Sequence, residues 1–257
     1  MKRNIRQDRI LEILARDGES TVESLVNQLG VSVMTIRRDL ASLSRSGQLS
    51  RTHGGAVLSR TGIVQFEFKD KSQLCIHQKR AIAAEAARMV LPGMSVSLDT
   101  GTTTLEVARV LASVDNLTVL TTSLAIASVL QGCDNIELIL LGGSVRKFSP
   151  DLTGPLTEDN LKNFRTHISI LGADAVTRDG SFTTDVRISQ ISKAMIENSD
   201  KAVLVVDSSK FARTAFVQCA SLNEIDTIIT DDECSPEVRE WVGQAECEVI
   251  YAKVTNE

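Results

Sequence analysis

Residues 30–57 read GVSVMTIRRDLASLSRSGQLSRTHGGAV, and this stretch decides the fold of the N-terminal part of the chain. Ser32 has the hydroxyl of a helix N-cap, and Gly47 closes the helix that follows. The apolar residues that recur in that helix at i, i+3, i+7 and i+10 are Val33, Ile36, Leu40 and Leu43. From Gln48 to Val57 the pattern alternates and then turns at a pair of glycines. The stretch therefore predicts a helix followed by a β-hairpin.

Two more helices are predicted ahead of this stretch. The apolar residues that share the face of the first are Ile10, Leu11, Ile13 and Leu14, so it runs from about Asn4 to Arg16. A second helix starts after Ser20 or Thr21 as its N-cap and ends at Gly30, where a left-handed backbone costs glycine least. Two helices joined by a tight turn containing Gly form a helix-turn-helix, to which the hairpin adds a wing. Residues 1–57 are therefore predicted to be a winged helix-turn-helix domain.

The face of the third helix opposite its apolar stripe carries groups that suit the major groove of DNA. Arginine can bond guanine O6 and N7 as a bidentate pair, while threonine and methionine can touch a thymine methyl group. In the hairpin, Arg51 and His53 are set to meet phosphates or the minor groove. The predicted DNA-binding residues are Ser32, Met34, Thr35, Arg37, Arg38, Arg51 and His53. A plain helical subdomain with solvated arginines is the alternative, and the agreement of turn, face and wing disfavours it.

The distribution of charge agrees with a DNA-reading module. The chain has a net charge of −5. Residues 1–60 carry ten Lys and Arg against six Asp and Glu, whereas the remainder carries eighteen against twenty-seven. A basic N-terminal segment followed by an acidic remainder fits a DNA-binding domain joined to a domain that does not contact DNA.

The composition predicts a globular chain without cofactor or metal. Its five cysteines lie far apart with no Cys-x-x-Cys pair, so neither a disulfide framework nor a zinc site is predicted. The sequence contains no P-loop and no Gly-x-Gly-x-x-Gly. We expect a cytoplasmic protein with reduced thiols, because no signal peptide follows the charged start. No run approaches the roughly 18 apolar residues of a membrane span, so no membrane partner is expected.

Beyond a linker at residues 58–75, the pattern of residues 76–257 predicts an α/β domain. Short apolar runs alternate with helical segments, which indicates a mostly parallel sheet covered by helices on both faces. The predicted strands are 95–98, 117–120, 136–141, 168–171, 202–206, 227–229 and 248–250. The predicted helices between them are 103–111, 124–130, 188–198 and 236–242.

Five consecutive strand ends of this domain carry small, hydroxylated or charged residues. In parallel sheets a ligand binds beyond the carboxyl ends of the strands, and a helix N-terminus offers free amides to an anion. Two cations, Arg146 and Lys210, would neutralise that anion, and Asp99 and Asp174 could hold sugar hydroxyls. The predicted effector-binding residues are Asp99, Gly101, Thr102, Thr103, Thr104, Thr122, Ser123, Gly142, Gly143, Arg146, Asp174 and Lys210.

Both halves of the chain resemble the DeoR family of bacterial repressors. In the first half the resemblance lies in Ser32–Leu40, followed by Leu43, Gly47 and Arg51–Ala56. In the second half the segments that stand in the family's order are Asp99–Thr104, Ser123–Ala127, Leu141–Gly143, Leu171–Asp174, Asp207–Phe211 and Ile229–Asp231. Departures occur at Thr100 and Thr122, where Ser and Asn are expected, and at Ser189-Gln190, where Glu-Ala is frequent.

The resemblance implies a repressor of a sugar-metabolism operon, released from its operator DNA by a phosphorylated sugar. It implies a sensor domain related to ribose-5-phosphate isomerase and glucosamine-6-phosphate deaminase. By the same resemblance Arg37 and Arg38 carry most of the operator contact, and Asp39 holds an arginine in place. Because one winged helix makes too few contacts for a rare site, we also expect a homo-oligomer, a dimer or a tetramer.

The alternative function is a sugar-phosphate isomerase or deaminase with an appended DNA-binding domain. Such chemistry needs a base near the reacting carbon. Of the three histidines, His53 is in the hairpin, His77 precedes the body and His167 begins its strand at the opposite edge. Asp174, Asp185 and Lys210 remain as conceivable acids and bases. We therefore predict no catalytic residues and no enzyme activity; a ligand-free chromosome-organising protein would not explain the strand-end residues.

Overall fold

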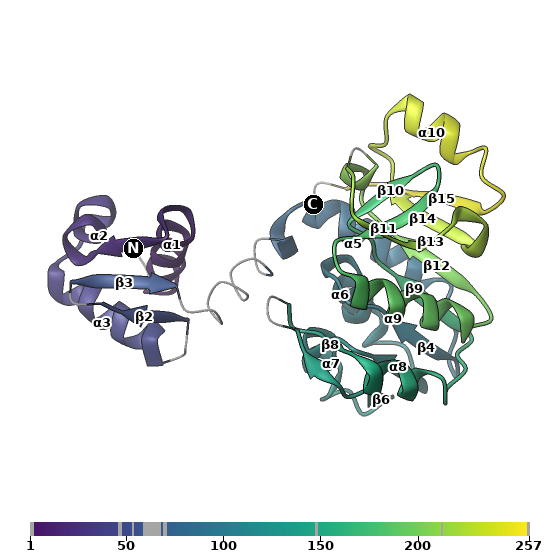
Figure 1. Cartoon of the computed structure of the whole chain (residues 1–257), viewed down its shortest axis with the longest axis horizontal. Coiled ribbons are helices and arrows are strands. Elements are labelled where there is room, and N and C mark those ends of the chain that lie inside the picture. The colour runs from purple at the N-terminus through teal and green to yellow at the C-terminus, as the bar shows by residue number, and fades with distance from the viewer. Residues whose placement is uncertain are drawn as a thin grey trace. The chain divides into compact units, whose positions relative to one another are not determined.

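The structure is a computed structural model that describes residues 3–45, 48–52, 54–58, 68, 71–146, 149–211 and 213–255. It divides into two compact units, Met1–Gln73 with Lys147–Ser149 and Leu74–Arg146 with Pro150–Glu257 (Figure 1). Most of the predicted linker, residues 58–75, lies outside the described residues, as do Gly47 and His53.

The first unit is a winged helix-turn-helix. Its elements are α1 (Arg3–Asp17), β1 (Glu19–Thr21), α2 (Val22–Leu29), α3 (Val33–Arg45), β2 (Leu49–Arg51) and β3 (Gly55–Leu58). The Thr21 hydroxyl accepts a hydrogen bond from Ser24 N at 3.2 Å and so caps α2, which ends at Gly30 with φ 64°. The Ser32 hydroxyl accepts from Thr35 N at 3.3 Å at the start of α3. These caps confirm the predicted starts of both helices and the end of α2.

The predicted hairpin has a third strand. Strand β3 pairs antiparallel with β2 on one side and with β1 on the other, where Ser20 lies opposite Ala56. A Cβ atom at Gly55 would lie 2.0 Å from the Ser20 carbonyl oxygen, so only glycine allows β1 and β3 to come this close. The three-residue strand β1 was not predicted, because Glu19–Thr21 is too short to show an alternation of its own.

The core of this unit is built from all three helices and the sheet. The buried apolar residues are Ile10, Ile13, Leu14, Val22, Leu25, Ile36, Leu40, Leu43, Leu49 and Ala56. The prediction is wrong for one residue of the apolar stripe, because Val33 is 42% exposed. Val33 is the first residue of α3 and precedes the turns that pack on the other helices, so its side chain remains in solvent.

The second unit is built on a seven-stranded sheet in which every neighbouring pair of strands is parallel. The strand order is β15-β14-β12-β9-β4-β5-β6. The strands are β4 (Ser95–Leu98), β5 (Leu117–Thr121), β6 (Ile136–Leu140), β9 (Ile168–Leu171), β12 (Ala202–Val205), β14 (Thr227–Asp231) and β15 (Glu248–Ala252). Each of the seven predicted strands is one of these, which confirms the predicted α/β fold.

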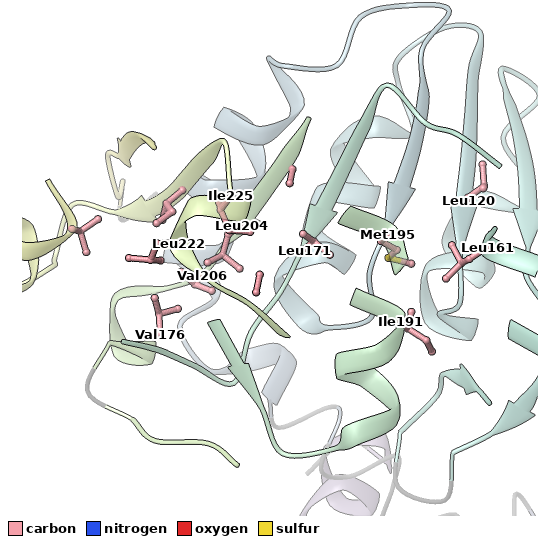
Figure 2. Packing of buried hydrophobic residues seen from close by; sticks show 14 of the residues in the cluster. Leu120, Leu161, Leu171, Val176, Ile191, Met195, Leu204, Val206, Leu222 and Ile225 are labelled. Atoms are coloured by element: carbon pink, nitrogen blue, oxygen red, sulfur yellow. The ribbon is translucent and has the colours of Figure 1, made fainter. Parts of the chain in front are cut away.

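Six helices of the described residues belong to this unit. They are α5 (Ile76–Ala87), α6 (Thr102–Leu111), α7 (Leu124–Leu130), α8 (Pro155–Leu161), α9 (Val186–Glu197) and α10 (Pro236–Val242). Helix α6 packs against both α5 and α7, while α8 packs against α9. One apolar core contains Ile191 and Met195 of α9, Leu171 of β9 and Leu204 of β12 (Figure 2). None of the described helices is long and apolar enough to cross a membrane.

Several short elements outside the seven-stranded sheet were not predicted. A hairpin joins β7 (Ser144–Val145) to β8 (Leu152–Thr153). A separate antiparallel sheet has the order β10-β11-β13, from Ala175–Thr177, Gly180–Thr183 and Val217–Ala220. The 3-10 turn η1 (Ser208–Lys210) follows β12. With two to four residues each, these elements give almost no periodic signal in the sequence.

The order of the strands creates a switch point in the sheet. From β4 the chain builds outward through β5 to β6, and it then returns to β9 on the other side of β4 and continues outward through β12, β14 and β15. The direction of winding therefore reverses between β4 and β9. At such a switch point the connections on the two sides diverge, and a ligand crevice opens beyond the carboxyl ends of the strands.

Candidate functional site

Helix α3 presents the predicted DNA-reading side chains to solvent. Met34 is 63% exposed, and Arg37 and Arg38 are exposed one turn further along. Within the described residues neither guanidinium forms an ion pair, so both remain available for phosphate or base contacts. Thr35 is half-buried, and its hydroxyl lies 2.9 Å from that of Ser32. Arg51 of β2 is also exposed.

Asp39 lies on the opposite face of α3 and faces the first helix. Its side chain is 2% exposed and accepts from Arg6 Nε at 2.5 Å and from Gln7 Nε2 at 3.2 Å. Asp39 therefore holds an arginine in place, and that arginine is Arg6 of α1. A buried carboxylate with a charged donor fixes the angle between α1 and the reading helix.

At the switch point, Asp99 follows β4 and is 1% exposed. One carboxylate oxygen accepts from Thr100 N at 2.7 Å and the other from Ser192 Oγ of α9 at 3.2 Å. Burial raises the pKa of Asp99 to about 7, although these hydrogen bonds oppose the increase. The carboxyl ends of the parallel strands form the rim of the sheet. The Asp99 carboxyl lies beneath this rim and links β4 to α9. Sequence reasoning did not identify Ser192 as its partner.

Helix α6 begins directly after Asp99 and Thr100. Gly101 precedes it with φ 147°, a conformation that favours glycine. The first amides of an α-helix have no partner within it, so those of Thr102, Thr103 and Thr104 are the kind of group that can bind an anion. The Thr104 hydroxyl is used locally, because it donates to the Gly101 carbonyl at 3.1 Å.

The end of β5 holds an unsatisfied hydroxyl. Thr122 is fully buried, and its Oγ1 is the one buried side-chain oxygen or nitrogen in the described part of the chain that lacks a hydrogen-bond partner. Such an orphan costs about 1–3 kcal/mol, so it indicates a group or a water that binds there. The neighbouring Ser123 hydroxyl is occupied, since it caps α7 by accepting from Ile126 N at 3.3 Å.

The two glycines after β6 allow close packing of α8. The Thr157 hydroxyl donates to the Gly142 carbonyl at 2.8 Å, and a Cβ atom at Gly143 would lie 2.0 Å from Thr157 Oγ1. Gly143 also has φ 126°. These residues therefore have a clear structural reason to be glycine in addition to the predicted ligand role.

Arg146 is part of an ion-pair network. Its Nε lies 2.7 Å from Asp151 Oδ2, a fully buried carboxylate, and its Nη1 lies 3.4 Å from Asp185 Oδ2. Arg187 also contacts Asp185, at 2.6 Å. Hydrogen bonds from Arg187 lower the pKa of Asp185 to about 2. Since Arg146 already neutralises two carboxylates, little of its charge is left for a ligand.

The last two predicted residues differ in how they are engaged. Asp174, after β9, accepts from the Thr183 hydroxyl at 3.1 Å and from Thr184 N at 3.1 Å, so it ties the end of β9 to β11. Lys210 lies half-buried on η1 and forms no ion pair within the described ranges. Of the two predicted cations, Lys210 is the one whose charge is available to an anion at the rim.

Sequence reasoning missed a third cation, Lys79 of α5. Its side chain is 3% exposed, and its Nζ donates to the Leu74 carbonyl at 2.7 Å. Burial lowers the pKa of Lys79; Asp207 opposes this shift and Lys210 adds to it. A signal was present, because Lys79 precedes the buried residues Ile82 and Ala83 by three and four positions on one helix face.

Two family models match the chain. Residues 6–61 match the DeoR-like helix-turn-helix domain, and residues 75–232 match the DeoR C terminal sensor domain. The chain belongs to the DeoR family. The predicted fold, DNA-binding function and family agree with these matches, and the DeoR sensor match includes the whole rim from Asp99 to Lys210.

Three relatives of this DeoR chain are named as repressors. It is 34% identical to the glycerol-3-phosphate regulon repressor of Escherichia coli K12, over 90% of this chain and 92% of the relative. It is 33% identical to the putative aga operon transcriptional repressor of Escherichia coli O157:H7, over 95% and 92%. It is 33% identical to the lactose phosphotransferase system repressor of Lactococcus lactis, over 95% and 97%. The similarity extends over nearly the whole chain, so this DeoR chain is a transcriptional regulator.

Similarity to solved structures is weaker. Ribose 5-phosphate isomerase A from Methanocaldococcus jannaschii matches with 22% identity and a TM-score of 0.38, over 52% of this DeoR chain and 53% of the isomerase. A likeness at this level carries no argument about catalysis. The described residues contain no group of His, Cys, Asp and Glu suited to a metal ion.

Proposed function

We propose that this regulator represses an operon of sugar metabolism and leaves its operator when a phosphorylated sugar binds at the switch-point rim of the seven-stranded sheet. The observation that carries the effector site is the reversal of strand order between β4 and β9, next to the free amides that begin α6. The phosphate binds the amides of Thr102–Thr104, and Lys210 supplies the positive charge. The orphan hydroxyl of Thr122 binds a polar group of the ligand.

Repression and the effector class are supported by the relatives. Their names attach them to glycerol 3-phosphate, to the aga operon and to the lactose phosphotransferase system. Glycerol 3-phosphate is itself a small phosphorylated polyol. A phosphate monoester is the chemical group common to such ligands, and it matches an amide-lined helix end with a nearby lysine.

On the DNA side, Arg37 and Arg38 contact the operator from α3. The support is their exposure without an ion-pair partner among the described residues. Ser32, Met34, Thr35, Arg51 and His53 complete the predicted contacts. Two copies of the chain bind paired half-sites, and residues 58–75 connect each winged helix to its sensor domain.

The test combines operator DNA with a panel of sugar phosphates. Operator fragments are selected by the full-length protein from the DNA flanking its own gene, and calorimetry measures sugar-phosphate binding with and without them. Coupling between two sites is reciprocal, so an effector that weakens operator binding must itself bind more weakly in the presence of operator. Binding of a phosphorylated sugar with no effect on operator affinity would refute release as the mechanism.

Catalysis is not favoured by the geometry of the conceivable acids and bases. Asp185 is ion-paired with two arginines and its lowered pKa makes it a weak base. Asp174 accepts hydrogen bonds from Thr183 and Thr184. Incubation with ribose 5-phosphate or an aminosugar phosphate, followed by product analysis, tests this directly, and we expect no conversion above background.

A further inference from the structure

The point at which the chain enters the sensor domain is held by a buried lysine. Leu74 is the first residue of that unit, and its carbonyl accepts from Lys79 Nζ at 2.7 Å. Burial of an ammonium group is costly unless it is well hydrogen-bonded, so this contact strongly favours one arrangement of the first turn of α5. That turn therefore forms a defined end point for the linker.

A row of hydrogen bonds leads from the same turn to the strand end that carries Lys210. Gln78 Nε2 donates to Glu233 Oε2 at 2.8 Å, and Glu233 N donates to Asp231 Oδ1 at 3.1 Å. The other oxygen of Asp231 accepts from Ser208 N of η1 at 2.6 Å. Asp231 is fully buried. Its two oxygens thus join the turn of Lys210, after β12, to the loop after β14 that contacts α5.

Charge provides a second connection between the same places. Lys79 and Lys210 are close enough for Lys210 to contribute to the lowered pKa of Lys79. An anion beside Lys210 would reduce this repulsion and stabilise the charged form of Lys79 that holds Leu74. Binding at the rim and order in the first turn of α5 are therefore expected to increase together.

We propose that Asp231 is the positioning residue through which an anion bound at the Lys210 turn orders the first turn of α5, and with it the end of the linker. This inference rests on the proposed function, because it requires the phosphate to bind near Lys210. An anion that fixes Lys210 restricts η1, whose Ser208 amide is held by Asp231. The restriction passes to Glu233 and Gln78 through bonds that are already formed. A ligand shifts such an element only through unequal affinity for its two states, so the coupling is measurable.

The experiment measures amide hydrogen exchange of residues 74–82 in the full-length protein. Inorganic phosphate is the probe, chloride at equal ionic strength is the reference, and the rise in melting temperature reports binding. We expect phosphate to slow exchange of residues 74–82 in the wild type. In Asp231→Asn, one acceptor oxygen is replaced by an amide NH2 group. Without phosphate, amide exchange of residues 74–82 should then become about tenfold faster, which is the size expected for the loss of a charge-assisted hydrogen bond. Phosphate still raises the melting temperature of Asp231→Asn but no longer slows exchange of residues 74–82.

Two further variants keep the result interpretable. Asp226→Asn is the matched control, because Asp226 also accepts a backbone N–H of another segment, Ala202 N at 2.7 Å, but at the start of β12; it should behave as wild type. Gln78→Met breaks the relay at a half-buried position that does not threaten folding, and it should reduce the phosphate effect on residues 74–82.

The outcomes separate the relay from the site. A wild-type response in Asp231→Asn, or unchanged exchange of residues 74–82 when phosphate does raise the melting temperature of the wild type, overturns the relay and leaves the proposed function standing. If phosphate does not raise the melting temperature of the wild type, the anion site at the rim is wrong and both proposals fall.

Discussion

Replacing Asp39 by alanine removes the buried carboxylate that fixes α1 against α3. Asp39 is 2% exposed and its partner Arg6 is 12% exposed, with their atoms 2.5 Å apart. Breaking a buried ion pair by removing one partner costs about 3–5 kcal/mol, because the other charge is left buried without compensation. Since Arg6 retains some contact with solvent, we expect the lower end, about 3 kcal/mol.

Most or all of this cost falls on the winged-helix domain. A small domain is stable by about 5–15 kcal/mol, so the loss is a large fraction of the total. With a urea dependence of about 1–3 kcal/mol/M, the unfolding midpoint of this domain falls by more than about 1 M. The single tryptophan, Trp241, lies in the sensor domain, so the transition is followed by hydrogen exchange of peptides from α1 and α3 as urea is increased.

A double-mutant cycle isolates the pair. Arg6→Met alone removes the Arg6 charge from the buried Asp39 carboxylate, whereas Arg6→Met combined with Asp39→Ala removes both charges of the pair and should recover part of the lost stability. If Asp39→Ala shifts the midpoint by less than experimental error, Asp39 does not hold α1 against α3 and this reasoning is wrong.

Three further predictions concern the operator, the buried carboxyl and the effector. Arg37→Ala or Arg38→Ala should weaken operator binding by roughly 1–3 kcal/mol if the arginine reads a base. If the arginine contacts only a phosphate, affinity for all DNA should fall and the slope of log affinity against log salt concentration should decrease by about one. Fluorescence anisotropy measures both. Burial raises the pKa of Asp99 to about 7, so the stability that its protonated form contributes is present below its ordinary pKa and is lost as pH rises through 7. Asp99→Asn should therefore remove the fall in unfolding free energy between about pH 4 and 7, as urea unfolding would show. Lys210→Ala should still bind operator but lose release by the effector, and wild-type effector affinity in this variant would show that Lys210 does not hold the phosphate.

The three helices of the DNA-binding domain and the seven strands of the main sheet could be predicted because their signals are local. Thr21 and Ser32 cap helices whose apolar residues follow within two turns, and Gly30 marks where α2 ends. Each strand of the sheet is a short apolar run between turn residues, and parallel strands buried on both faces have such runs. Strands β1, β7 and β8 have only two or three residues each and were not predicted, because so few positions show no alternation of apolar and polar residues.

The sequence by itself determined the two-part organisation, the family and the edge of the sheet at which polar residues gather. Only the tertiary structure decided which of those residues remain available to a ligand, because the partners that engage the others are distant in the chain. Asp99 is held by Ser192, 93 positions away, and Arg146 by Asp185, 39 positions away. The order of the strands, which creates the switch point between β4 and β9, likewise depends on pairings that no local pattern encodes. Lys79 shows the same limit: the helix period puts it on the buried face, but only the fold brings it near Lys210.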